Sequence, residues 1–311
     1  MGKPAVLLVA RLPEPLGGRL RERFDCHELA QLDAAGLQAL APQLRGMVAT
    51  GESVVSRALL ASLPALEVIS VLGVGYDGID MAAARERGIC VAHTPGLSTD
   101  DIADFAMALL LAAARQVVNA DQFVRRGDWS TGRFPMTRRV SGARLGIVGL
   151  GRIGRAVAQR ALAFGMEIAY TGRTPKADAP YRWHNDTQAL AAHVDFLVVC
   201  ASGGADTRAL VNADVLAALG PTGVLVNIAR GSIVDEDALI TALRERQILA
   251  AGLDVFCHEP QVAPALLALD NVVLTPHMAS TTGATVQAMF DLTFDNLAAH
   301  FDGLPVPAPV A

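Results

Sequence analysis

The chain has 311 residues, enough for two domains, and its 52% hydrophobic and 18% charged residues are typical of a folded protein with large cores. Its net charge of −5 argues against a nucleic-acid-binding protein, which usually carries a basic surplus. The N-terminal apolar stretch is too short for a signal peptide, the apolar run 105–114 is too short to span a membrane, and the four scattered cysteines lack metal-ligand spacing. We therefore expect a soluble cytoplasmic protein with reduced cysteines and no metal site.

The first hundred residues contain short apolar runs that predict buried parallel strands, at 5–10, 47–50, 68–73 and 90–93. A long stretch with helical spacing follows, from Thr99 to Arg126, with Asp100 and Asp101 in its first turn. Acidic residues are favourable at a helix N-terminus. This stretch suits a linker helix between two α/β domains.

A second series of apolar runs follows, at 144–149, 167–170, 196–201, 224–229, 250–256 and 271–276. Segments with helical spacing separate many of them, and such alternation favours parallel sheets built from βαβ units. A last helical stretch, 284–300, is expected to cross back to the first domain, before a Pro-rich extended tail. We therefore predict one domain over 1–97, with 284–311 packing back on it, and a second over 98–283.

The second domain opens with a glycine motif, "GLGRIG", from Gly149 to Gly154. It follows an apolar strand and leads directly into a helix, which is the context of a dinucleotide-binding G-x-G-x-x-G turn. Gly149 permits the tight turn, Gly151 lets the backbone approach a pyrophosphate, and Gly154 allows close packing of helix on strand. The first helical residues, Arg152 and Ile153, present free N–H groups to the phosphates. The alternative is a purely structural strand–helix turn.

The strand after this motif ends without the acid that usually holds the adenosine ribose of NAD. It ends in Tyr170-Thr171-Gly172, and Arg173 and Thr174 follow. A guanidinium and a hydroxyl are the donors that a 2′-phosphate needs, so the sequence favours NADP(H) over NAD(H). The alternative is an exposed Arg173, with the role of the acid taken by Thr171 or by no residue.

The other strands of the second domain also end at candidate residues. Because ligands of open parallel sheets bind outside the carboxyl ends of the strands, these residues are expected to line one crevice. In chain order they are Ala201 and Ser202, Ile228 and Arg230, Asp254 and Glu259, and His277.

Three of these side chains together suit the reduction of a 2-keto acid. Arg230 can bind a carboxylate through two N–H groups or polarise a carbonyl. A carboxylate at Glu259 would stabilise the charged imidazole of His277, which could then donate a proton near neutrality. Each residue also has an ordinary explanation, such as a surface salt bridge or a simple turn at "HEP", and His258 is an alternative imidazole.

Five ordered blocks resemble the D-isomer-specific 2-hydroxyacid dehydrogenases, and within that family the glyoxylate/hydroxypyruvate reductases. The blocks are "LGVGYDGID" with "HTPGLSTDDIADFAMALLLA", "VSGARLGIVGLGRIGRAVAQRALAFGM", "LVNIARGSIVDEDAL", "AGLDVFCHEP" and "LTPHMAS". The resemblance covers nearly the whole chain. It implies an α/β protein of two doubly wound parallel-sheet domains, a Rossmann cofactor domain and a flavodoxin-like substrate domain, with a cleft between them.

The resemblance also implies an activity, the reduction of a small 2-keto acid to the D-2-hydroxy acid by hydride transfer from NADPH, and we expect a homodimer. Arg230 would bind the substrate carboxylate and keto group, and His277, paired with Glu259, would be the general acid. Backbone amides of Val74 and Gly75 would hold the carboxylate from the other domain. Asp254 would contact the nicotinamide amide, with a buried structural Asp as the alternative.

The chain departs from the family pattern in two places. Residues 201–207 read "ASGGADT" instead of a proline-containing loop, and "HTPG" places His93 where Asn is more usual. We interpret His93 as structural, with a substrate contact as the alternative. A non-catalytic nucleotide-sensing protein or corepressor of the same fold is less favoured, because it would not need Arg230, Glu259 and His277 together. A dehydrogenase of phosphite stays open, and the sequence does not identify which 2-keto acid is the substrate.

Overall fold

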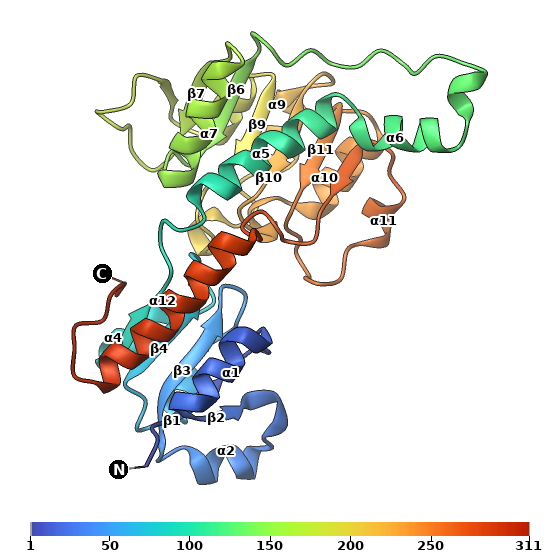
Figure 1. Cartoon of the computed structure of the whole chain (residues 1–311). Coiled ribbons are helices and arrows are strands. Elements are labelled where there is room, and N and C mark those ends of the chain that lie inside the picture. Colours follow the sequence, from blue (N-terminus) through green and yellow to red (C-terminus); the bar gives the residue numbers. More distant parts are fainter. Residues whose placement is uncertain (1, 311) are drawn as a thin grey trace. The chain divides into compact units, whose positions relative to one another are not determined.

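The computed structural model describes residues 2–310, which form two compact units (Figure 1). The smaller unit comprises residues 2–98 and 281–310, and the larger comprises residues 99–280. Each unit is a parallel sheet with helices on its faces. Within the described residues, no helix is long and apolar enough to cross a membrane.

The sheet of the smaller unit has five parallel strands within its described residues, in the order β2-β1-β3-β4-β5. This order is that of the flavodoxin-like fold. The strands are β1 (Ala5–Leu8), β2 (Asp25–Glu28), β3 (Leu44–Thr50), β4 (Val68–Leu72) and β5 (Cys90–Ala92). The helices are α1 (Glu14–Arg23), η1 (Leu29–Gln31), α2 (Ala34–Leu40), α3 (Arg57–Ala61), α4 (Met81–Glu86) and α12 (Gly283–Phe301).

The central strands of this sheet are buried on both faces, which explains their continuous apolar sequences. Leu7 and Met47 belong to the core on one face, whereas Val6 and Val48 belong to the core on the other. Helix α12 packs on the second core beside α1 and β4. The segment after α12 lies along the edge strand β5, where Val310 N–H donates to the Val91 carbonyl at 2.7 Å.

The sheet of the larger unit has seven parallel strands within residues 99–280, in the order β12-β11-β10-β9-β6-β7-β8. This is the Rossmann order with one strand added at the edge. The strands are β6 (Arg144–Val148), β7 (Glu167–Thr171), β8 (Arg182–His184), β9 (Phe196–Val199), β10 (Val224–Asn227), β11 (Ala250–Leu253) and β12 (Val272–Leu274). The helical segments are α5 (Thr99–Ala114), α6 (Val117–Arg125), η2 (Asp128–Ser130), α7 (Arg152–Ala163), α8 (Thr187–Ala191), η3 (Ala205–Thr207), α9 (Ala213–Leu219), η4 (Gly231–Ile233), α10 (Glu236–Arg244) and α11 (Pro264–Leu267).

The prediction of one continuous linker helix over 99–126 is wrong. Gln116 adopts a left-handed backbone with φ of 51°, which a right-handed helix cannot contain, so the stretch divides into α5 and α6. Helix α5 is a core element of the larger unit, because it packs against α7, β10 and β11 (Figure 1).

Candidate active site

The glycine turn joins β6 to α7, and two of its glycines pack against neighbouring backbone atoms, whereas the middle one has free space beside it. A Cβ at Gly149, whose φ is 95°, would lie 2.8 Å from the backbone of Ala201, and one at Gly154 would lie 2.3 Å from the Gly149 carbonyl oxygen. A Cβ at Gly151 would meet no described atom within 4 Å. No described side chain caps α7 at its N-terminus, so its first N–H groups can bind an anion. This backbone fits a pyrophosphate.

The loop after β7 is fixed at two points and exposes Arg173. The hydroxyl of Tyr170 accepts a hydrogen bond from the Lys176 N–H at 2.7 Å, and Asp178 pairs with Arg155 at 2.8 Å. The hydrogen bond from Arg155, a residue of α7, lowers the pKa of Asp178. Arg173 and the next residue, Thr174, are exposed in this loop. The Arg173 side chain forms no hydrogen bond or ion pair with the described residues.

The remaining predicted cofactor residues follow β9 and β10. Ala201 lies against the glycine turn, and the carbonyl of Ser202 accepts a hydrogen bond from the Thr207 hydroxyl at 2.8 Å. Ile228 is buried just after β10. In the sheet, β9 is the neighbour of β6, and β10 is the next strand beyond β9. The residues that follow β9 and β10 therefore lie on the same edge of the sheet as the glycine turn.

Asp254 is buried, with only 1% of its surface exposed, and both of its carboxylate oxygens are engaged. Oδ1 accepts from the Thr275 hydroxyl at 2.6 Å and from the Met278 N–H at 2.9 Å, and Oδ2 accepts from the Ala279 N–H at 2.8 Å. The structure therefore makes Asp254 the anchor of the segment that carries His277. Its contact with the nicotinamide amide stays a prediction.

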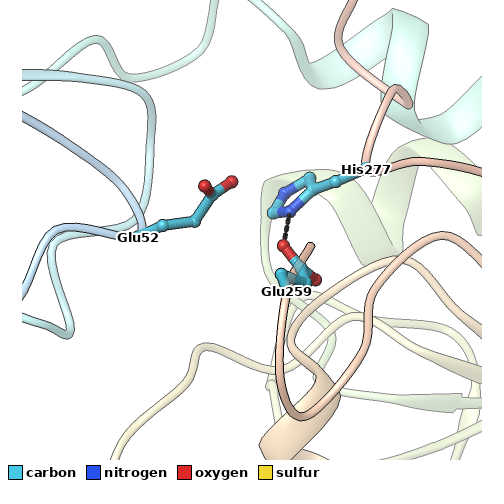
Figure 2. Close-up of side chains that lie close together, drawn as sticks. All are labelled: Glu52, Glu259 and His277. Atoms are coloured by element: carbon cyan, nitrogen blue, oxygen red, sulfur yellow. Dashed lines mark hydrogen bonds and ion pairs between the residues drawn. The ribbon is translucent and has the colours of Figure 1, made fainter. Parts of the chain in front are cut away.

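His277 and Glu259 face each other across a short hydrogen bond (Figure 2). Nδ1 of His277 lies 2.7 Å from Oε2 of Glu259. Oε1 of Glu259 accepts from the Phe256 N–H at 2.8 Å, and the His277 N–H donates to the Asp254 carbonyl at 2.8 Å. The Glu259 carboxylate is therefore held by two hydrogen bonds, and His277 is held by its ring through Glu259 and by its backbone through Asp254. Glu52, the third residue drawn in Figure 2, belongs to the smaller unit.

The carboxylate of Glu259 is charged. Burial raises the pKa of Glu259, but hydrogen bonds from His277 and the Phe256 amide, together with the positive charges of His277 and Arg230, outweigh it. The net effect is a pKa below the usual value for glutamate. An ionised Glu259 favours the protonated imidazole of His277, since opposite charges at this distance attract.

Arg230 lies at the end of the turn that follows β10. Its Nη1 donates to the Ala229 carbonyl at 2.8 Å. The buried side chain of Asn227 donates to the Arg230 carbonyl at 2.9 Å and accepts from the Ala229 N–H at 3.1 Å. A Cβ at Gly231 would lie 2.0 Å from the Phe256 carbonyl carbon, so this turn packs directly on the turn leading to Glu259.

Sequence reasoning did not single out Asn227. The signal was available, because Asn227 is a polar side chain at the carboxyl end of an otherwise apolar buried strand. Such a residue must find hydrogen-bond partners, and here it finds them in the turn that orients Arg230.

The structure places Arg230, Glu259 and His277 in one unit, after the neighbouring strands β10, β11 and β12. His258, the alternative imidazole, is exposed. Val74 and Gly75 follow β4 and belong to the smaller unit.

A family model described as "D-isomer specific 2-hydroxyacid dehydrogenase, NAD binding domain" matches residues 107–279, more than half of the chain. The chain belongs to this family. The 2-ketogluconate reductase of Gluconobacter oxydans is 43% identical to this chain over 308 residues, covering 99% of each sequence. A glyoxylate/hydroxypyruvate reductase A of Arabidopsis thaliana is 41% identical over 307 residues, covering 98% of each.

The family also provides a solved structure close to this one. An NADPH-dependent glyoxylate/hydroxypyruvate reductase from Sinorhizobium meliloti, in complex with NADP and malonate, is 43% identical, with a TM-score of 0.93. The match covers 100% of this chain and 97% of that one. The resemblance to the family that the sequence indicated is thereby confirmed, as are the two doubly wound parallel-sheet units.

Proposed function

We propose that this protein reduces a small 2-keto acid, such as glyoxylate or hydroxypyruvate, to the D-2-hydroxy acid with NADPH as the hydride donor. The observation that carries the proposal is the 2.7 Å hydrogen bond between His277 and Glu259, at the same sheet edge as Arg230 and the glycine turn. The names of the similar reductases from Gluconobacter and Arabidopsis support it.

Each side chain has one task in the proposed reaction. Bound NADPH supplies the hydride that is added to the keto carbon. The guanidinium of Arg230 binds the substrate carboxylate and polarises the keto oxygen. Nδ1 of His277 is engaged by Glu259, so Nε2 donates the proton to that oxygen as negative charge develops on it. The N–H groups of Val74 and Gly75 supply further donors for the carboxylate.

The test is an assay of glyoxylate, hydroxypyruvate, pyruvate and 2-ketogluconate with NADPH and with NADH. We expect measurable reduction of at least one short 2-keto acid and a higher kcat/KM with NADPH. If every substrate stays unreduced with both cofactors while NADPH still binds, the non-catalytic nucleotide-binding function becomes the better explanation.

The pH dependence of reduction should report the pair of His277 and Glu259. The lowered pKa of Glu259 keeps its carboxylate charged at neutral pH, so the fall in rate at high pH reflects loss of the His277 proton. Glu259→Gln preserves size but removes the charge that favours protonated His277. The falling limb of kcat/KM should therefore move to lower pH. A limb at the native position in the variant would show that Glu259 does not act on His277.

We also propose that the protein is a homodimer, joined through α6 and the segment after it. This part of the larger unit exposes several large apolar side chains, of which Trp129 is 70% and Met136 is 99% exposed. Large apolar side chains that are exposed to water in one segment are unfavourable, and an interface that covers them would remove this cost. Light scattering should give twice the chain mass of 32.6 kDa for the native protein. It should give the monomer mass for Trp129→Ser/Met136→Ser; a native monomer would contradict the proposal.

A further inference from the structure

The loop after β4 is held by the two residues that follow β5. The carbonyl of Gly73 accepts from the Thr94 N–H at 2.9 Å, and the Gly73 N–H donates to the Thr94 hydroxyl at 3.1 Å. The next carbonyl, that of Val74, lies 2.9 Å from Nδ1 of His93. Two successive carbonyls therefore both face the segment of His93 and Thr94.

This arrangement fixes the direction of two N–H groups. In a trans peptide the C=O and the N–H of one unit point in opposite directions. Because the carbonyls of Gly73 and Val74 face His93 and Thr94, the N–H groups of Val74 and Gly75 point away from them. Neither N–H has a hydrogen-bond acceptor anywhere in residues 2–310. Successive N–H groups aimed the same way form an anion-binding concavity.

His93 is itself held in place. Its N–H donates to the Ala308 carbonyl at 3.1 Å, and its carbonyl accepts from Asn296 at 3.2 Å. Its ring meets Tyr76 edge-on, with 5.3 Å between the ring centroids. A carbonyl oxygen only accepts hydrogen bonds, so Nδ1 of His93 must carry the hydrogen in this contact.

We propose that His93 is a positioning residue for substrate binding. Its Nδ1–H fixes the peptide between Val74 and Gly75 and thereby aims the Gly75 N–H at the carboxylate of the 2-keto acid, beside the Val74 N–H, whose direction Thr94 sets through the Gly73 carbonyl. The inference rests on the proposed function for the assignment of these two N–H groups to the carboxylate. It gives His93 a task that neither a purely structural residue nor a direct substrate contact would have.

The test compares two substitutions at the same position. His93→Leu removes the donor but retains an apolar side chain, whereas His93→Asn retains an N–H close to the place of Nδ1. One neutral hydrogen bond changes affinity by roughly 2- to 13-fold, so His93→Leu should raise the KM for glyoxylate about 3- to 10-fold. The dissociation constant of oxamate, a carboxylate that cannot be reduced, should rise equally. The kcat and the KM for NADPH should stay within about twofold, and His93→Asn should restore the glyoxylate KM.

The matched control is His300→Leu. His300 is another half-buried histidine of the same unit, with Nε2 3.0 Å from Glu67, and it lies at the end of α12. This substitution should leave the glyoxylate KM and the oxamate affinity unchanged. A purely structural role for His93 predicts that His93→Leu and His300→Leu behave alike.

Several results would overturn the proposal. The first is that His93→Leu binds oxamate with the affinity of the native enzyme. The second is that His93→Asn raises the glyoxylate KM as much as His93→Leu does. A large fall in kcat without rescue by Asn would indicate direct contact of His93 with the reacting group. Nitrogen-15 NMR of the native enzyme with labelled histidine gives a test that does not depend on the Leu variant folding. The His93 signal is assigned by its loss in His93→Asn, and an unprotonated Nδ1 on His93 would contradict the proposal. Oxamate binding requires no turnover, so an enzyme that binds oxamate but reduces no keto acid contradicts the proposed function instead.

Discussion

Replacing His277 with asparagine should lower kcat for keto-acid reduction by about 10²- to 10⁴-fold, because the variant has no group that can donate the proton. Asparagine can still donate a hydrogen bond to Glu259 from about the place of Nδ1, so the local structure should persist. The glycine turn and Arg173 follow other strands, β6 and β7, so the dissociation constant for NADPH should stay unchanged. Steady-state kinetics and titration of the cofactor by fluorescence measure the two quantities separately.

The control for this experiment is His258→Asn, since His258 is an exposed histidine in the turn next to Glu259. It should retain native turnover. Near-native activity in His277→Asn or His277→Ala would remove His277 from the mechanism, and His258 or His93 would become the next candidate for the proton donor.

Replacing Arg173 with alanine should reduce the preference for NADPH over NADH by roughly 10- to 150-fold, since a hydrogen bond to a charged group contributes about 1.5–3 kcal/mol. Arg173 is exposed and unpaired among the described residues, and the acid of its loop, Asp178, is engaged by Arg155. A 2′-phosphate at this place would therefore meet a guanidinium and no competing carboxylate from the loop. The measurement is kcat/KM with each cofactor at a fixed 2-keto acid concentration.

Lys176→Ala is the matched control, because Lys176 is an exposed cation of the same loop whose backbone N–H, not its side chain, holds Tyr170. It should change the cofactor ratio much less than Arg173→Ala. A native preference for NADH, or an unchanged ratio in Arg173→Ala, would show that the missing acid does not select NADP(H).

The sequence predicted most strands because parallel strands buried on both faces appear as continuous apolar runs. It did not predict β2 and β8, whose sequences are "DCHE" and "RWH". Both are edge strands that pair on one side only and bury little apolar surface, so they carry no hydrophobic run. The break at Gln116 was equally invisible, because neither glycine nor proline marks it.

For the site, position along the strands was enough to nominate Arg230, Glu259 and His277, since all parallel strands end at one edge of the sheet. The supports of these residues were not predictable in the same way. Asp254 holds the segment of His277 through hydrogen bonds, and Asn227 holds the turn of Arg230 in the same way. Which oxygen accepts from which N–H in these contacts is decided only when the loops have packed. Spacing in the sequence does not encode such contacts.

The smaller unit is assembled from two distant parts of the chain, whereas the larger unit is continuous. On the ribosome, residues 99–280 are therefore complete before α12 has been made. Until residues 281–310 emerge, the apolar surface that α12 covers stays exposed, and Ala308 cannot yet accept from the N–H of His93. Domains of a nascent chain usually fold from the N-terminus onward. Here the unit whose synthesis begins first is the one that is completed last.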